Sequence, residues 1–148
     1  MSSQEDAAAR VVRQFLEAVE RHDLEQIGAK LAPDVIQYYQ RPTGRSDDGK
    51  LNNAFKQGRE AIVEEIRDHF HVTLYQRGTV RLNIERLISQ DGWVAAQFSL
   101  YAKTIGSNID YENFYFFLFE VRDGIIVRYW EYIDTAYANA TLYPQFAK

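Results

Sequence analysis

The segment YENFYFFLFEVRDGIIVRYWEYIDT, residues 111–135, decides the fold that we expect for this chain. Two runs rich in aromatic and β-branched residues flank the pair Asp123-Gly124, which is a strong signal for a β-hairpin. The second run carries Glu131 and Asp134, three positions apart. This spacing would put both carboxylates on one face of a helix, but on a strand it sends them to opposite faces. We therefore predict a strand on which Glu131 and Asp134 point in opposite directions.

Upstream of this hairpin the hydrophobic pattern keeps the period of strands back to about residue 79. Asp91-Gly92 supplies a turn between two alternating runs, and Gly106 to Asn108 supplies another. A separate short run, VIQYYQ, precedes these and also has strand character. We predict strands near residues 34–40, 79–90, 92–105, 110–122 and 125–134.

The first part of the chain has helical spacing instead. Apolar residues recur at helical intervals over residues 5–20, Asp23 can cap a second short helix, and residues 58–70 form a third. Residues 41–58 contain Pro and Gly among polar residues and predict a long loop with one helical turn near residues 51–55. Loops of this length in a compact domain are usually functional or mobile.

Three helices followed by a bent antiparallel meander predict an α+β fold in which the helices cover one face of the sheet. With 148 residues, 46% apolar and 26% charged, the chain has the composition of one globular domain spanning residues 1–148. Seventeen basic and 21 acidic residues give a net charge of −4 without a basic block, so nucleic acid is not an expected partner.

Other features of the composition narrow the function further. The absence of cysteine excludes disulfides, thiolate metal sites and a cysteine nucleophile. No metal-binding or phosphate-binding motif stands out, so we expect neither a metal nor a cofactor. No apolar run has the length of a membrane span, and the polar start does not resemble a secretory signal. A cytoplasmic location without membrane association is the default expectation.

Aromatic residues are unusually frequent, with ten Tyr and nine Phe. Most must form the core, but some could wall a pocket for a small hydrophobic molecule. The remainder exceeds what one small core requires, and we predict a homodimer formed through the outer face of the sheet. The candidate interface residues are Tyr101, Trp130 and Tyr132, which oppose the face proposed for the pocket.

Three segments resemble the NTF2-like superfamily: FLEAVERHDLEQIGAKLAPDV, GREAIVEEI and, most specifically, residues 111–135. The resemblance covers nearly the whole chain and is closest to the SnoaL-like polyketide cyclases, relatives of ketosteroid isomerase. It implies a cone in which helices pack on a strongly curved sheet. It also implies dimers and a reactive pocket between the sheet and the helices.

The chain is also similar to limonene-epoxide hydrolase, whose catalytic Asp on the last strand falls on Glu131. The Arg-x-Asp pair of that enzyme falls on Phe98 and Leu100, and its water-holding Tyr and Asn fall on Gln37 and Tyr39. Because the acid and its Arg partner are replaced by apolar residues, the similarity does not carry the rest of the hydrolase machinery.

Glu131 is the main catalytic candidate, and its surroundings depend on the hairpin register. A three-residue loop at Arg122-Asp123-Gly124 would place Tyr115 opposite Glu131, whereas a two-residue turn would reverse the parity and align Glu131 with Phe116. In the first case Asn113, Tyr115 and Phe117 share a face with Tyr129 and Glu131. Aromatic surroundings would raise the pKa of Glu131, while Tyr115 and Asn113 could polarise a carbonyl group. The alternative is a structural Glu bonded to Tyr hydroxyls or paired with an Arg.

The expected substrate-binding residues are Gln37, Tyr39, Phe98, Leu100, Phe117 and Tyr129.

Other polar and aromatic residues have simpler interpretations. Asp134 is expected to cap a C-terminal helix at residues 135–142. His69 and His71 are expected at the end of a helix and the start of a strand, and His22 is expected to be exposed. Trp93 and Trp130 are interpreted as packing or interface residues.

Three functions remain open from the sequence. The leading hypothesis is a SnoaL-like enzyme that performs cofactor-free acid/base isomerisation, cyclisation or dehydration of a hydrophobic cyclic or carbonyl substrate. The alternatives are a non-catalytic protein that binds a small molecule and an epoxide hydrolase-like enzyme. A second titrating group beside Glu131 would favour catalysis, and a lone Glu would favour binding.

Overall fold

The computed structural model describes residues 5–142. Its elements run, in chain order, α1 (Ala7–Arg21), α2 (Leu24–Ala29), β1 (Leu31–Arg45), β2 (Leu51–Gln57), α3 (Arg59–Glu65), the π-helix η1 (Ile66–Leu74), β3 (Arg81–Gln90), β4 (Trp93–Lys103), β5 (Asp110–Arg122), β6 (Ile125–Ile133) and α4 (Thr135–Leu142). Within the described residues, none of the helices combines the length and apolar character that a membrane crossing requires.

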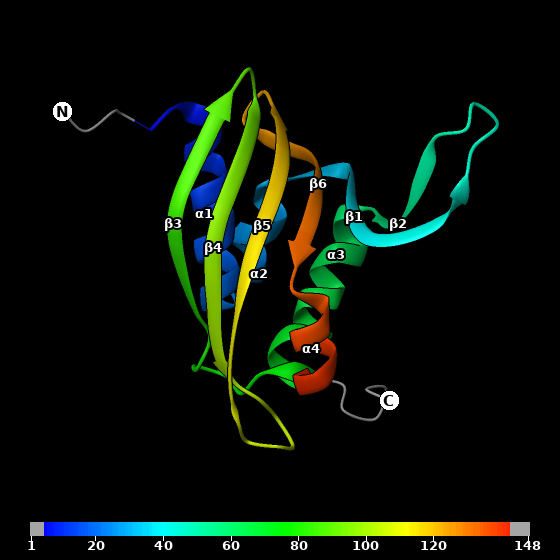
Figure 1. Cartoon of the computed structure of the whole chain (residues 1–148). Helices are drawn as coiled ribbons and strands as arrows, with labels where there is room; N and C mark the ends of the chain where they lie inside the picture. The colour runs from blue at the N-terminus through cyan, green and yellow to red at the C-terminus, as the bar shows by residue number, and fades with distance from the viewer. Residues whose placement is uncertain (1–4, 143–148) are drawn as a thin grey trace.

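The strands form one curved sheet in the order β2-β1-β6-β5-β4-β3, and α1 and α2 lie against one side of it (Figure 1). This confirms the α+β fold and the positions of the predicted strands. The pairs β3–β4, β4–β5 and β5–β6 form the expected antiparallel meander. One pair differs from the expectation, because β1 runs parallel to β6. The chain can make this parallel pair because the helices and the meander separate β1 from β6 in sequence.

The predicted loop at residues 41–58 is wrong. The chain instead continues β1 to Arg45 and returns as β2, and this hairpin projects beyond the rest of the sheet (Figure 1). The helical turn expected near residues 51–55 is also wrong, since these residues belong to β2. Pro42 and Gly44 lie at register shifts in the β1–β2 ladder, where a missing N–H or side chain is tolerated. The side-chain amide of Asn53 donates to the carbonyl of Tyr39 over 2.8 Å.

The third helix is longer than predicted because α3 passes directly into η1. A π-type hydrogen bond from the N–H of Tyr75 to the carbonyl of Phe70, 3.1 Å long, closes its last turn. The Thr73 hydroxyl donates to the carbonyl of His69 over 3.0 Å. Both His69 and His71 therefore lie inside a helix, and the prediction that they mark its boundary is wrong.

Aromatic packing joins α1 to the inner face of the sheet. Phe15 is buried, and its ring centroid lies 5.9 Å from that of Phe119 and 5.8 Å from that of Tyr129. A second apolar cluster near the start of β3 includes Tyr75, Val80 and Tyr111. These two clusters hold the helices at a fixed position over the curved sheet.

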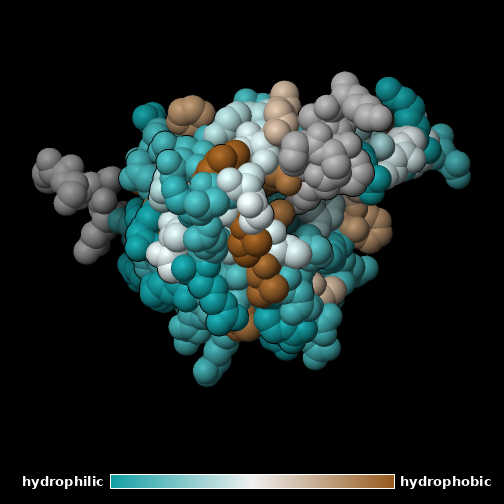
Figure 2. All heavy atoms as spheres, turned by 90° about the horizontal axis from the view of Figure 1, so that it is seen from below, coloured by the Kyte–Doolittle hydropathy of each residue, from teal (hydrophilic) through white to brown (hydrophobic). Residues whose placement is uncertain are grey.

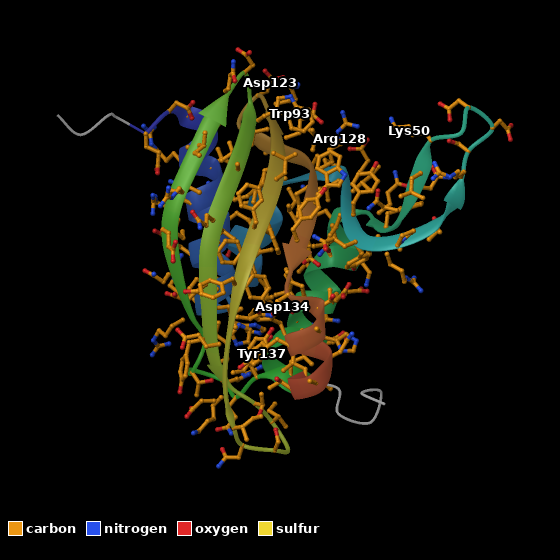
Figure 3. The ribbon with its side chains drawn as sticks, viewed as in Figure 1. Lys50, Trp93, Asp123, Arg128, Asp134 and Tyr137 are labelled. Atoms are coloured by element: carbon orange, nitrogen blue, oxygen red, sulfur yellow. The ribbon has the colours of Figure 1, made fainter. Side chains whose placement is uncertain are left out.

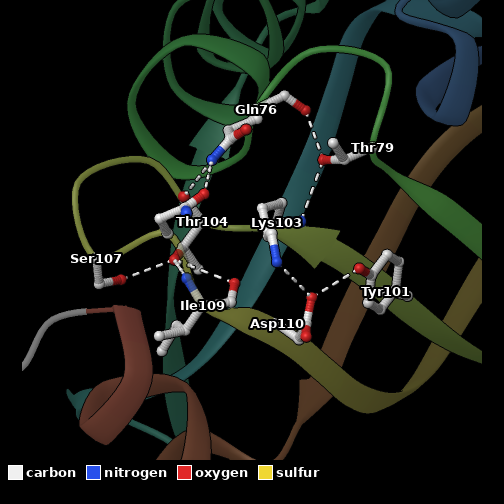
Figure 4. Close-up of polar contacts among 9 residues, drawn as sticks. Gln76, Thr79, Tyr101, Lys103, Thr104, Ser107, Ile109 and Asp110 are labelled. Atoms are coloured by element: carbon white, nitrogen blue, oxygen red, sulfur yellow. Dashed lines mark hydrogen bonds and ion pairs between the residues drawn. The ribbon is translucent and has the colours of Figure 1, made fainter.

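Polar contacts close the end of the molecule at which β4 turns into β5 (Figure 4). The carboxylate of Asp110 accepts hydrogen bonds from the Tyr101 hydroxyl (2.8 Å) and the Lys103 amine (3.1 Å). The Gln76 amide donates to the carbonyl of Thr104 over 3.0 Å. These bonds tie the β4–β5 turn to the segment that follows η1.

Trp93 lies near the Asp123 turn (Figure 3), and its ring centroid is 5.8 Å from that of Trp130 on the outer face of the sheet. Trp130 stacks on Tyr38 with ring centroids 4.9 Å apart, and the Arg128 guanidinium lies 5.9 Å and 5.6 Å from the rings of Trp93 and Trp130. The same guanidinium forms an ion pair with the buried carboxylate of Glu120. This arrangement agrees with the packing role expected for both tryptophans.

Candidate functional site

A cavity of about 320 Å³ lies between the inner face of the sheet and the helices. Its wall is largely apolar, and hydrophobic side chains reach the surface in a narrow band at the end of the molecule where α4 lies (Figure 2). Its volume is in the lower part of the range for small-molecule pockets. Eight of the nine predicted site residues line it: Gln37, Tyr39, Phe98, Leu100, Tyr115, Phe117, Tyr129 and Glu131.

The register that brings Glu131 into this cavity differs from the one expected. The turn contains two residues, Asp123 and Gly124, so Arg122 pairs with Ile125. A register shift then follows, because Val121 pairs with Ile126 but Glu120 pairs with Arg128. This bulge at Val127 restores the parity that the two-residue turn alone would have reversed.

The cross-strand partner of Glu131 is consequently Phe117, and Tyr115 pairs with Ile133. The prediction that Tyr115 lies directly opposite Glu131 is wrong, because the partner is displaced by two residues along β5. Both side chains nevertheless share the inner face of the sheet. They are diagonal neighbours, a relationship that separates residues by roughly 7–8 Å.

Within residues 5–142, the Glu131 carboxylate accepts a hydrogen bond from one side chain of a neighbouring strand. The Gln37 amide on β1 donates to its Oε1 over 2.6 Å. Burial disfavours the charged form and raises the pKa of Glu131 to about 7, with the Gln37 hydrogen bond opposing the rise and the nearby Glu65 charge adding to it. The raised pKa agrees with the expectation from the sequence, and it lets the carboxyl both accept and release a proton near neutral pH.

A second carboxylate reaches the same cavity from α3. Glu65 lines the wall, accepts a hydrogen bond of 3.2 Å from the Tyr39 hydroxyl, and forms an ion pair with Lys56 of β2. Burial, followed by the charges of Glu65 and Glu131, raises the pKa of Tyr39, so this hydroxyl stays protonated. The sequence interpretation missed Glu65. Its position one turn after the inward-facing Ile62 was the available signal.

Asn113 does not line the cavity, contrary to the prediction. It is buried behind the wall, where its amide donates to the Tyr111 hydroxyl (2.9 Å) and to the carbonyl of Asp134 (3.1 Å). The Tyr111 hydroxyl in turn lies 2.9 Å from that of Tyr115. Asn113 therefore reaches the cavity wall through Tyr111, a lining residue that the sequence interpretation also missed.

Tyr115 lines the cavity together with Tyr111. Its ring stacks on Phe98, with centroids 5.3 Å apart, and burial raises the pKa of its hydroxyl. Because the Tyr111 oxygen accepts from Asn113, its own proton can go to Tyr115. The Tyr115 hydroxyl also interacts with Tyr75, so a ligand oxygen competes with Tyr75 for the Tyr115 proton.

Asp134 lies outside the cavity, at the start of α4 (Figure 3). Its Oδ1 accepts a hydrogen bond of 3.1 Å from the N–H of Tyr137, which confirms the predicted cap. The ring of Tyr137 stacks on Tyr111 with centroids 5.3 Å apart. Asp134 thus holds α4 next to Tyr111 and contributes no acid to the cavity.

Comparison with known proteins identifies the family but no specific reaction. The sequence profile of the SnoaL-like domain matches residues 12–129, and no functionally curated protein matches the chain. Among solved structures, an NTF2-like protein of unknown function from Burkholderia pseudomallei has 22% sequence identity and a TM-score of 0.74. The alignment covers 94% of this chain and 99% of that one.

Two further structures carry functional descriptions of their own. A protein from Catenulispora acidiphila with a ketosteroid isomerase-like fold, in complex with trimethylamine, is 15% identical with a TM-score of 0.70, over 89% of this chain and 91% of that one. An LEH-like epoxide hydrolase from M. tuberculosis is 21% identical with a TM-score of 0.65, over 92% and 89%. At these identities the likeness concerns the fold. The profile match over most of the sequence shows that the chain belongs to the SnoaL-like domain family, on the NTF2-like fold.

Proposed function

We propose that this protein is a small-molecule enzyme that moves a proton on a hydrophobic cyclic or carbonyl substrate without a cofactor. The observation that carries the proposal is the Glu131 carboxyl, which lies in an apolar cavity with a pKa raised to about 7. A group with such a pKa is well matched to acid/base work near neutral pH. Glu65, which lines the same cavity, supplies a second carboxylate, and this favours catalysis over binding alone.

The proposed step is the transfer of a proton between two carbons of a carbonyl compound. Glu131 takes a proton from the carbon next to the carbonyl, the electrons of the broken C–H bond move onto the oxygen, and an enol or enolate forms. Tyr115 donates a hydrogen bond to this oxygen, with Tyr111 and Asn113 orienting the Tyr115 hydroxyl. When the carbonyl compound carries a β,γ double bond, a dienolate forms and Glu131 returns the proton to its γ carbon, which completes an isomerisation. In a cyclisation, the enolate carbon bonds to the carbon of an internal carbonyl, whose C=O π electrons move onto its oxygen, and Glu131 gives its proton to that oxygen.

The charges in the cavity restrict the substrate. Among its described lining residues are two carboxylates, Glu65 and Glu131, and no Lys or Arg. Because Lys56 already pairs with Glu65, a carboxylate or phosphate on the substrate would meet the negative charge of Glu131 without a Lys or Arg partner in the lining. A neutral molecule fits best, and a small cation is the next choice. The trimethylamine held by the Catenulispora acidiphila protein is a ligand of that second kind.

A non-catalytic binding protein is the second candidate, and one observation favours it. The ion pair with Lys56 already compensates the charge of Glu65, which leaves Glu131 as the single reactive carboxyl. Epoxide hydrolysis has less support, because Phe98 and Leu100 occupy the cavity wall where the hydrolase places its acid and Arg.

Solvent deuterium exchange distinguishes these candidates even when the reaction product has not been identified. Neutral cyclic ketones that raise the thermal unfolding midpoint are incubated with the protein in D₂O, and deuterium uptake beside the carbonyl is followed by NMR. We expect catalysed exchange in the wild type, and a loss of at least about 100-fold in E131Q with ligand affinity retained. E112Q, which changes an exposed carboxylate on β5, is the matched control. Ligands that bind without exchange above the buffer rate would replace the enzyme proposal with the binding one.

A further inference from the structure

A second hollow, of about 460 Å³, lies at the C-terminal end of α1 and shares no lining residue with the aromatic cavity. Three segments of the chain meet there: the last turn and cap of α1, the middle of η1, and the turn that leads into β3. Its lining residues are Glu20, Arg21, His22, His71, Arg77, Gly78 and Arg81. The side chains are almost entirely polar, with five groups able to carry positive charge.

Two histidine rings form one wall of this hollow. The ring centroids of His22 and His71 lie 4.4 Å apart, in an edge-to-face arrangement. His71, which is buried, has its Nε2 3.1 Å from the carbonyl oxygen of Val19, and this nitrogen must carry the proton because a carbonyl only accepts. The prediction that His22 is exposed is wrong, since the left-handed backbone at this residue (φ +58°) turns its ring against His71.

The Nδ1 atom of His22 is buried and has no hydrogen-bond partner within residues 5–142. Buried polar atoms are rarely left without a partner, because the loss of hydration is not compensated. The atom is closed to solvent in the present ring orientation, so a ligand in the hollow reaches it only after the His22 ring turns. After this rotation the wall offers a polar group that a ligand atom could satisfy.

The positive charges around the hollow outnumber the negative ones. In the part of the chain that the structure describes, Arg21, Arg77 and Arg81 form no ion pair with a carboxylate within 4.0 Å. The single lining carboxylate, Glu20, accepts a hydrogen bond of 2.7 Å from the N–H of Leu82. Burial, the partner ring and the positive charge of Arg77 lower the pKa of His22, so the cluster opposes further protonation.

We propose that this hollow binds an oxyanion, the phosphate or carboxylate group of a small ligand. Guanidinium groups recognise such groups through paired, charge-assisted hydrogen bonds. Arg77 lies close enough for its charge to act on both histidine rings, and it supplies the main contact. Arg21 and Arg81 complete the cationic wall. His22 donates from its ring once the anion is present. The site is independent of the reaction proposed for the aromatic cavity.

Calorimetry with inorganic phosphate tests the proposal, at an ionic strength held constant with NaCl. We expect saturable binding that R77Q weakens at least tenfold, while R86Q on β3 leaves it unchanged because Arg86 is exposed and outside the hollow. H22N should also weaken binding, and Asn tolerates the left-handed backbone at this position. A parallel titration with acetate shows whether the site takes phosphate or carboxylate, and saturable binding of either supports it.

Histidine NMR provides an independent readout on the same samples. A bound anion favours the protonated rings, so phosphate should raise the pKa of both His22 and His71, and R77Q should remove most of this rise. Absence of saturable binding to either anion, or R77Q binding as tightly as the wild type, would overturn the proposal.

Discussion

Gln37 and Glu131 are 94 positions apart in the chain, and the Gln37 amide donates a 2.6 Å hydrogen bond to the Glu131 carboxylate. The contact exists because β1 pairs in parallel with β6, which sets Gln37 beside Tyr129 in the ladder. It stabilises the charged form of a carboxylate that its surroundings otherwise keep protonated. The balance between the two effects sets the pKa at which Glu131 can work.

Replacement of Gln37 by Leu should raise the pKa of Glu131 further, since the variant loses the donor and makes the surroundings more apolar. A ¹³C NMR titration of the labelled carboxyl measures the change directly. Q40L, at an exposed position of the same strand, should leave the pKa where it is. An unchanged or lower pKa in Q37L would contradict the role assigned to this hydrogen bond.

Replacement of Glu65 by Gln should have the opposite effect on the same carboxyl. The negative charge of Glu65 raises the pKa of Glu131, and its removal also frees the Lys56 cation to attract the Glu131 carboxylate. The acidic limb of any pH–rate profile should then move to lower pH in E65Q. E64Q, which alters the neighbouring carboxylate on α3, serves as the control, and a shift of equal size in E64Q would show that the effect is not specific.

Glu131 should also make stability depend on pH. Between the ordinary pKa of a glutamate, about 4.3, and its folded value of about 7, the folded state binds more protons than the unfolded state. The free energy of unfolding of the wild type should therefore fall relative to that of E131Q as the pH rises from about 5 to about 8, by up to about 3 kcal/mol.

Urea unfolding of both proteins at several pH values measures this difference. The comparison with E131Q cancels the contributions of the histidines, which both proteins share. Parallel curves for the two proteins over this range would mean that Glu131 titrates normally.

The outer face of the sheet should form the interface of a homodimer. Phe114, Phe116 and Tyr132 expose 74%, 47% and 44% of their surface there, and Phe116 pairs with Tyr132 across β5 and β6. Exposed apolar patches of this kind mark interaction surfaces. Of the residues named from the sequence, Tyr132 belongs to this patch, whereas Tyr101 and Trp130 are less accessible.

Sedimentation of the wild type and of F114K/F116K tests the interface. The wild type should sediment as a dimer and the double variant as a monomer, because two buried ammonium groups would disfavour the contact. V72K, which changes an exposed apolar residue on η1, should remain dimeric. A wild type that is monomeric at every concentration would remove this prediction.

The sequence by itself determined the elements whose signals are local. Asp123-Gly124 fixed the position of the hairpin, the alternating pattern fixed the strands, and Asp23 and Asp134 accept the N-cap hydrogen bonds expected of them. The predicted face of Glu131 was also right, although the turn and register that determine it differ from the expected ones. The expected three-residue loop and the observed turn with a bulge at Val127 give the same parity.

The tertiary structure alone decided the contacts between distant segments. The packing of β1, α3 and β5 decides three features of the site. Gln37 donates a hydrogen bond to Glu131, Glu65 lines the cavity, and Asn113 is hydrogen-bonded to Tyr111 and does not line the cavity. The β1–β2 hairpin was hidden because Pro42 and Gly44 signal a loop locally but are tolerated at bulges of an edge pair. Short-range patterns specify which face a side chain takes, whereas its partners follow from long-range pairing and bulges that no local pattern encodes.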